Sequence, residues 1–255
     1  MITAGIDCGA KNVRVVVFGE GKMLSKSVTP AGVDTSTAAE KAYDAALESA
    51  GVSRDEVEKV LATGAGKSEP AFKAGVITEV RADARGIHFL NPEVRTVIDV
   101  GAEEGRAIKI DALGKVVDFA INERCAAGAG AFTEAMARAL ELPLEEIGPL
   151  SLESTEAIAL SAQCTVFAET EVVALVHSKT AKPDVARAIH DSIAERITSM
   201  ARRVGIEGKV ALIGGLAKNV GFLKSLEEDL DTEIVLVGEV EYVGALGAAL
   251  VASDE

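Results

Sequence analysis

The sequence predicts an α/β protein built from two similar subdomains. Segments rich in β-branched residues alternate with segments whose apolar residues fall at helical spacing, which is the pattern of strands packed against helices. A strand–turn–strand pattern at the start of the chain returns near its middle. A buried strand near the end runs through a Gly-Gly turn into a helix, in "ALIGGLAKN" (211–219). Together these three observations favour a duplicated α/β architecture.

The first part of the chain predicts a hairpin, a helix and a further strand. "VRVVVF" is β-branched and apolar, and "GEG" follows it as a hairpin turn. Residues 35–51 have helical spacing, with Thr35 or Ser36 as the cap and Gly51 as the end. "KVLATGAGKSE" (59–69) is predicted to be a strand that breaks into a glycine-rich turn.

The hairpin returns as an internal repeat. Its offset is 92 positions (99 − 7), and four identities fall in register: Asp7 with Asp99, Gly9 with Gly101, Ala10 with Ala102, and Arg14 with Arg106. Both copies read strand, D-x-G-A turn, strand, turn, strand. The shared context makes the match more than chance identity and predicts two related subdomains.

The second half is richer in helix. Residues 129–142 are predicted to form a helix that stops before Pro143, and 154–180 a turn followed by a helix with Cys164 near its start. Residues 182–205 predict a long amphipathic helix, with Pro183 in its first turn and Gly205 at its end. "TEIVLVG" is predicted to be a strand and "GALGAALVAS" a closing helix.

Composition excludes several kinds of partner. The 255 residues are enough for one large domain or two smaller ones. A net charge of −14, 4% aromatic residues and no Trp argue against nucleic acid and anionic membranes. The absence of a basic, apolar leader and of an apolar run near 20 residues predicts a cytoplasmic protein.

The two D-x-G turns predict a magnesium–phosphate site. A carboxylate at a strand end can hold Mg²⁺ through its waters, while the turn's N–H groups bind phosphate oxygens. Asp7 and Asp99 supply the carboxylates, and Lys11 and Asn12 can add donors. One such turn alone is usually structural, but two at matched places in a repeat favour a polyphosphate held between facing subdomains. Gly214 and Gly215 either let the backbone approach a flat ligand such as a nucleotide or form a tight strand-to-helix turn.

Three cysteines remain to be explained. Cys8 lies inside the first D-x-G turn and is interpreted as a core residue. Cys125 in "NERCAAGAGAF" and Cys164 in "SAQCTVF" are 39 positions apart (164 − 125). In a cytoplasmic protein these thiols are core residues, reactive groups or metal ligands rather than a disulfide framework.

The order of these motifs resembles the actin-like ATPase superfamily. The two cysteine motifs, in turn, resemble one branch of it: the ATP-dependent activators of 2-hydroxyacyl-CoA dehydratases, with the related ATPase subunits of benzoyl-CoA reductase and the reductases of double-cubane cluster proteins. The resemblance runs over nearly the whole chain. It implies two actin-like (ribonuclease H-like) subdomains with a nucleotide cleft between them. Residues 1–95, joined by a C-terminal helix at about 243–255, would form one, and 96–242 the other.

The resemblance also implies roles for the motif residues. Asp7 and Asp99 would hold Mg²⁺ and the ATP phosphates, and Glu103 would orient the attacking water. The implied nucleotide-binding residues are Gly9, Ala10, Lys11, Asn12, Gly101, Ala102, Gly214, Gly215, Ala217 and Asn219. Relatives often have "IGGQD" where this chain has "VGAEE" (100–104). They also have "CAAGTGRF" where this chain has "CAAGAGAF", so that Ala129 replaces a threonine and Ala131 an arginine.

Members of this branch are dimers that share one [4Fe-4S] cluster on the two-fold axis. Dehydratase activators are homodimers, as expected here, whereas benzoyl-CoA reductase uses two different ATPase subunits. Carried over by motif, its ligands would be Cys125 and Cys164, two from each protomer. Small residues after Cys125 would let backbone amides approach the cluster. Ferredoxin or flavodoxin would reduce it, and ATP hydrolysis would drive electrons to an iron–sulfur dehydratase or reductase. The alternatives are a small-molecule kinase of the same fold and a regulatory ATP switch.

Overall fold

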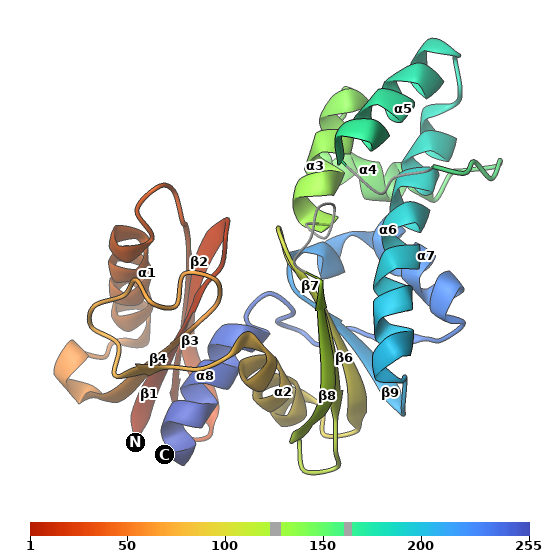
Figure 1. Ribbon diagram of the computed structural model, residues 1–255. Helices are drawn as coiled ribbons and strands as arrows, with labels where there is room; N and C mark the ends of the chain where they lie inside the picture. Colours follow the sequence, from red (N-terminus) through yellow and green to blue (C-terminus); the bar gives the residue numbers. More distant parts are fainter. Residues whose placement is uncertain (123–128, 161–164) are drawn as a thin grey trace. The chain divides into compact units, whose positions relative to one another are not determined.

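The chain folds into two compact units and contains two five-stranded sheets (Figure 1). The computed structural model describes residues 1–122, 129–160 and 165–255. The first unit comprises Met1–Val97, Ile110–Val117 and Val237–Glu255, and the second Ile98–Lys109 and Asp118–Leu236. The predicted α/β class is confirmed, whereas the subdomain boundaries read from the sequence stay a prediction.

The first sheet is built around the N-terminal hairpin. Its strand order is β3-β2-β1-β4-β5, and β1 pairs antiparallel with β2 and parallel with β4. Left-handed backbone at Glu20 and Gly21, with φ of 54° and 74°, makes the tight turn that "GEG" predicts. The strands are β1 (Ile2–Cys8), β2 (Asn12–Gly19), β3 (Lys22–Pro30), β4 (Val57–Thr63) and β5 (Gly75–Val76).

Alternating side chains of β2 serve two different helices. Val13, Val15 and Val17 join the core beneath α1 (Thr35–Ala50), whereas Val16 and Phe18 join the core beneath α8 (Val243–Asp254). This period of two is what a strand buried on both faces requires. The sheet is therefore covered by a helix on each side.

The ends of α1 test the capping prediction. Gly51 ends the helix in the left-handed conformation, with φ of 67°, as predicted. The predicted cap was wrong by one residue. Asp34 caps the helix, because its side chain accepts a hydrogen bond from the backbone N–H of Thr37 at 3.0 Å.

The second sheet repeats the first. Shifting β1 by 92 positions gives residues 94–100, which are the bounds of β6. The strand order β10-β9-β6-β7-β8 has the same form as that of the first sheet, with β6 in the place of β1. The internal repeat is thus confirmed as a structural duplication. The strands are β6 (Val94–Val100), β7 (Gly105–Ile110), β8 (Val116–Asn122), β9 (Lys209–Ile213) and β10 (Ile234–Val235).

The helices of the second unit include those predicted around the cysteine motifs. At the carboxyl end of β6, the backbone N–H of Gly130 in α3 bonds to Gly101. Figure 1 shows α3, α4 and α5 gathered at one end of this unit, with α6 running down past its sheet. The α6 helix has proline in its first turn and Gly205 at its end, as predicted. The helices are α3 (Ala129–Ala139), α4 (Leu144–Ser151), α5 (Thr165–His177), α6 (Lys182–Val204) and α7 (Val220–Leu230).

Among the described residues, none of the helices combines the length and the apolar character needed to cross a bilayer.

Glycines allow α8 to pack tightly on the first unit. A Cβ atom at Gly5 of β1 would lie 2.9 Å from the Cβ of Ala248, and one at Gly247 would lie 2.5 Å from the carbonyl carbon of Ala82. Ala82 belongs to α2 (Glu79–Leu90), so the small residues of α8 lie between β1 and α2. The predicted closing helix is therefore confirmed as the central helix of this unit.

We expect Gly5→Ala and Gly247→Ala each to lower the free energy of unfolding by about 1–3 kcal/mol or more, because the added methyl meets backbone atoms that cannot move aside. Gly238→Ala is the matched control, since nothing lies within 4 Å of the added methyl there. It should change stability by less than about 0.5 kcal/mol. Urea unfolding of the three variants measures the difference, and equal stabilities would refute the close packing of α8.

Candidate functional site

The first D-x-G turn lies where β1 and β4 end side by side. Asp7 pairs with Thr63 across the two strands, and Gly64 follows directly after β4 with φ of 87°. A Cβ atom at Gly64 would lie 2.5 Å from the Oδ1 of Asp7 and 2.6 Å from the carbonyl oxygen of Cys8. Only glycine permits this approach, so Gly64 fixes the surroundings of the Asp7 carboxylate.

The second turn reproduces the same arrangement. Gly214 follows directly after β9, has φ of 89°, and would carry a Cβ atom 2.5 Å from the carbonyl oxygen of Val100 and closer still to the Oδ1 of Asp99. Asp99 therefore stands to Gly214 as Asp7 stands to Gly64. The Gly-Gly motif at 214–215 was predicted either to approach a ligand or to form a tight strand-to-helix turn. Its first glycine lies against Asp99, and its role in nucleotide binding stays a prediction.

Hydrogen bonds join the second turn to α3. The N–H of Gly101 donates to the carbonyl of Glu104 at 2.9 Å, which closes the turn. The N–H of Gly130 donates to the carbonyl of Gly101 at 3.1 Å, and the N–H of Ala131 donates to the carbonyl of Ala102 at 3.0 Å. Within the described residues, the N–H groups of Ala102 and Glu103 make no backbone hydrogen bond, which leaves them as the turn's donors for an anion.

Arginines occupy matched places beside the two turns. Arg106 forms ion pairs with both Asp99 and Glu104, and all three side chains are at least two-thirds buried. Arg14 pairs with Glu241 at 2.7 Å. Sequence reasoning used both arginines only as identities in the repeat. Arg14 lies opposite Asp7 across β1 and β2, and Arg106 bonds to Asp99 at the matching place in the repeat. This position next to each aspartate was the signal that could have marked the arginines as part of the site.

A second carboxylate lies close to Asp7. Asp83 of α2 is 4% exposed. A Cβ atom at Gly244 would lie 3.3 Å from the Oδ1 of Asp83 and 3.5 Å from the Oδ2 of Asp7, so the two carboxylates flank the start of α8. Asp83 was missed because α2 was missed. The α2 helix contains Gly86, because Val243 of α8 comes too close there for a side chain. A glycine inside a helix weakens the helical pattern in the sequence.

The other predicted nucleotide-binding residues differ in exposure. Lys11 and Gly215 are exposed, whereas Ala217 is buried. The side chain of Asn219 caps α7, because its Oδ1 accepts a hydrogen bond from the N–H of Phe222 at 3.0 Å. Their assignment to nucleotide binding stays a prediction, as do those of Gly9, Ala10 and Asn12. Cys125 and Cys164 lie outside the described residues.

Cys8 is a core residue, as predicted. Its side chain is fully buried in the cluster between β1 and α1. Burial, followed by the negative charge of Asp7, raises the pKa of the Cys8 thiol to about 12. A thiol with that pKa is protonated at neutral pH, which removes Cys8 from the candidate ligands and nucleophiles.

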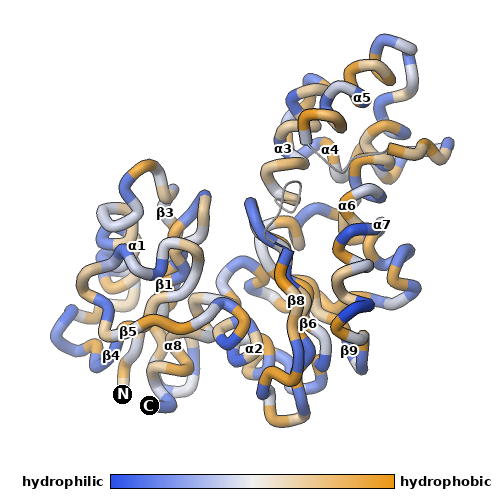
Figure 2. The backbone as a smooth tube through the Cα atoms, viewed as in Figure 1, coloured by the Kyte–Doolittle hydropathy of each residue, from blue (hydrophilic) through white to orange (hydrophobic). Residues whose placement is uncertain are grey.

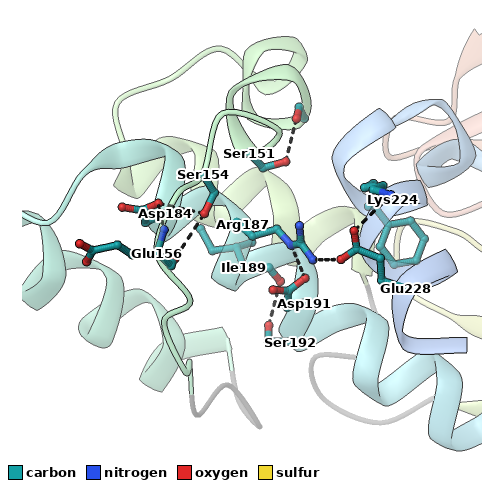
Figure 3. A network of polar contacts seen from close by, with 12 residues as sticks. Ser151, Ser154, Glu156, Asp184, Arg187, Ile189, Asp191, Ser192, Lys224 and Glu228 are labelled. Atoms are coloured by element: carbon teal, nitrogen blue, oxygen red, sulfur yellow. Dashed lines mark hydrogen bonds and ion pairs between the residues drawn. The ribbon is translucent and has the colours of Figure 1, made fainter. Parts of the chain in front are cut away.

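A polar network holds residues 154–156, which precede the Cys164 motif in the sequence (Figure 3). Asp184, in the first turn of α6, accepts hydrogen bonds from the backbone N–H groups of Glu156 and Thr155 at 3.0 and 2.8 Å and from the hydroxyl of Ser154 at 2.9 Å. These bonds lower the pKa of the Asp184 carboxyl. One turn further along α6, Arg187 bridges Asp191 of the same helix to Glu228 of α7.

No group of three or more His, Cys, Asp or Glu side chains among residues 1–122, 129–160 and 165–255 lies close enough together to hold a metal ion. A magnesium ion bound to a nucleotide keeps several waters and takes its remaining ligands from one or two carboxylates and the phosphates. Each aspartate turn, taken by itself, has one carboxylate at the end of a strand, so the absence of a larger cluster does not conflict with that kind of binding.

A duplicated sheet with an aspartate turn and an opposing glycine in each copy defines an actin-like ATPase fold. The chain belongs to the BadF/BadG/BcrA/BcrD ATPase family, whose model matches residues 4–252.

Solved structures and curated relatives agree with this assignment. The activator of the 2-hydroxyisocaproyl-CoA dehydratase from Clostridium difficile, solved with bound ADPNP, is 32% identical, with a TM-score of 0.93 over 100% of this chain and 95% of that one. Component A of the (R)-2-hydroxyglutaryl-CoA dehydratase from Acidaminococcus fermentans is 36% identical, with a TM-score of 0.95 over 100% and 98%. One of the subunits of benzoyl-CoA reductase from Thauera aromatica is 38% identical over 98% of this chain and 92% of its own length.

Proposed function

We propose that this chain is an ATP-hydrolysing activator that delivers low-potential electrons to an iron–sulfur partner enzyme. The observation that carries the proposal is its full-length similarity to activators of 2-hydroxyacyl-CoA dehydratases, together with cysteine motifs at Cys125 and Cys164. The similarity to part of a benzoyl-CoA reductase supports the same class of reaction.

The two aspartate turns support the nucleotide part of the proposal. Asp7 and Asp99 would hold Mg²⁺ through its waters, and the N–H groups of Ala102 and Glu103 would bind phosphate oxygens. The carboxylate of Glu103, which is exposed, would orient the attacking water. Gly214 and Gly215 would let the backbone approach the adenosine, with Ala217 and Asn219 shaping the turn behind them. Within its own unit, each carboxylate is already packed against a glycine, so the carboxylate itself needs little local reorganisation on binding.

The described residues nearest the cysteines support a shared cluster. The α5 helix begins at Thr165, directly after Cys164, and its first turn exposes Val166 and Phe167 by 66% and 73%. Figure 2 shows the apolar stretches that α5 carries. An exposed apolar turn of this kind is typical of a surface that a partner covers, and we propose that the second protomer of a homodimer covers it. Cys125 and Cys164 of each protomer would then ligate one [4Fe-4S] cluster, which supplies the one-electron chemistry.

The coupling between ATP and electron delivery follows from linkage. Nucleotide can change the arrangement of the dimer only by binding one arrangement better than the other. The hydrogen bonds from α3 to Gly101 and Ala102 offer a route, because α3 begins four positions after Cys125. Ferredoxin or flavodoxin would be the electron donor, and a 2-hydroxyacyl-CoA dehydratase, benzoyl-CoA reductase or double-cubane protein the acceptor.

We expect the reduced protein, prepared without oxygen, to be oxidised by a 2-hydroxyacyl-CoA dehydratase in the presence of MgATP and not in the presence of MgADP. Stopped-flow absorbance near the charge-transfer band of the cluster measures the oxidation. A sample without the dehydratase is the control for simple autoxidation. Equal oxidation rates with the two nucleotides, or phosphorylation of a small molecule by a colourless preparation, would contradict the proposal.

A further inference from the structure

We infer that Arg106 is a positioning residue for the proposed ATP hydrolysis, acting through Asp99; the inference rests on that proposed function. Arg106 lies on β7, next to the second turn, and its guanidinium is about 10% exposed. One of its nitrogens, Nη1, bonds to the Oδ2 of Asp99, and the other, Nη2, bonds to the carboxylate of Glu104. A planar guanidinium has donors on two terminal nitrogens and can hold both acids at once in fixed directions, whereas the single ammonium of a lysine lacks this rigid fork.

The other oxygen of Asp99 is constrained by a glycine. Its Oδ1 lies against the α-carbon of Gly214, at a place where any Cβ atom would collide. Arg106 therefore binds one oxygen of this carboxylate, and Gly214 packs against the other. This arrangement fixes the direction of the lone pairs that are proposed to meet the hydrated magnesium ion.

The second bond of Arg106 acts on the turn itself. Glu104 accepts a hydrogen bond from the N–H of Gly101 through its main-chain oxygen and binds Arg106 through its side chain. Its main chain and side chain are thus both held in place. The intervening residues Ala102 and Glu103, whose N–H groups point to no backbone acceptor among the described residues, are held between these fixed ends. Fixed donors stabilise a developing phosphate charge better than mobile ones.

The ion pair is a poor candidate for a purely stabilising contact. Burying two or three charges together costs desolvation energy that their attraction often only balances. Arg54 pairs with Asp44 at an exposed site, where the side chains are 44% and 59% exposed. The two arginines beside the aspartate turns pair at buried sites instead, and the side chains of Arg14 and Glu241 are 14% and 18% exposed. The buried pair at the end of β6, beside a proposed catalytic carboxylate, fits a role in preorganising that carboxylate.

The test compares Arg106→Gln and Arg106→Lys with the wild-type protein in steady-state ATP hydrolysis. We expect kcat to fall about 10- to 100-fold in Arg106→Gln, the scale of a misplaced catalytic group, and less in Arg106→Lys, which keeps the charge but not the fork. The Mg²⁺ concentration for half-maximal activity should rise in both variants, while KM for ATP changes only a few-fold. Lys109→Gln is the matched control, because it removes a positive charge from the same strand. Among the described residues, the ammonium of Lys109 forms an ion pair with Glu207 and not with either acid of the turn.

A double-mutant comparison separates positioning from direct contact. Adding Arg106→Gln to Asp99→Asn should lower kcat by less than about twofold beyond Asp99→Asn alone, because the partner through which it acts is already lost. Wild-type kcat and Mg²⁺ dependence in Arg106→Lys and Arg106→Gln would overturn the inference, and so would fully additive losses in the double mutant. Absence of ATP hydrolysis by the wild-type protein would instead refute the proposed function. Circular dichroism and urea unfolding show whether the variants fold. If Arg106→Gln does not fold, the kinetic test is made with Arg106→Lys alone.

Discussion

Replacing Asp7 or Asp99 by asparagine is expected to lower the rate of ATP hydrolysis by about 100-fold or more. Each aspartate is the last residue but one of a central strand, and in each copy a glycine with positive φ lies against the Oδ1 of the carboxylate. Asparagine keeps the shape that this contact requires but removes the negative charge that would hold hydrated Mg²⁺. The loss should therefore appear in kcat and in the Mg²⁺ dependence rather than in the fold.

The choice of asparagine matters most at Asp99. Alanine there would leave the buried guanidinium of Arg106 without one of its two carboxylate partners, and breaking a buried ion pair typically costs about 3–5 kcal/mol. Lost activity would then be confused with lost structure. Asp118→Asn is a matched control, since Asp118 is an exposed aspartate on β8. Phosphate release by all three variants gives the result, and normal turnover in Asp7→Asn and Asp99→Asn would place the phosphate site elsewhere.

The duplicated sheet could be predicted because its signals are local. The strands of the repeat are short β-branched runs next to Gly and Asp turns, and their registers match at an offset that appears directly in the sequence. The two long helices α1 and α6 carry clear end signals at Gly51 and Gly205. These features depend on neighbours within a few residues, which is the range that sequence patterns describe well.

The elements that were missed depend on tertiary contacts. The α2 helix buries Asp83 and Gly86, which weaken an amphipathic pattern but fit the close approach of α8. The α4 helix has only eight residues and contains Pro149, which reads as a break in sequence. The residues that interrupt the helical pattern of α2 and α4 can be explained only when the surface that each helix packs against is known.

The candidate site was predicted in part for the same reason. The aspartates are marked by their own turns, and so they could be found from the sequence alone. Gly64 and Arg106 are part of the site because each contacts an aspartate on another strand. They lie 57 positions (64 − 7) and 7 positions (106 − 99) from those aspartates in the sequence. The matched residues Gly64 and Gly214 follow strands that lie outside the detected repeat, so its offset could not align them.

Replacing either Cys125 or Cys164 by serine is expected to remove the iron–sulfur cluster completely while leaving a folded protein that binds ATP. Two thiolates per chain complete a four-thiolate site only through two-fold symmetry, so one substitution removes two of the four ligands of a dimer. A half-ligated cluster is not expected to persist, and the loss should therefore be nearly total rather than half. Wild-type protein prepared without oxygen should contain about four iron and four sulfide per dimer, and each variant close to none.

Cys8→Ala is the matched control, because Cys8 is the third cysteine of the chain and is fully buried with a thiol pKa of about 12. It should keep the wild-type iron and sulfide content. Nucleotide binding by all three variants shows whether the ATP site survives, since the cysteines lie in segments separate from both aspartate turns. Full iron and sulfide in Cys125→Ser or Cys164→Ser would exclude that residue as a ligand. If both variants lost all iron and sulfide but the wild-type protein were a monomer, two protomers would not share the cluster. The proposed link between ATP binding and a change at the dimer axis would then have to be abandoned.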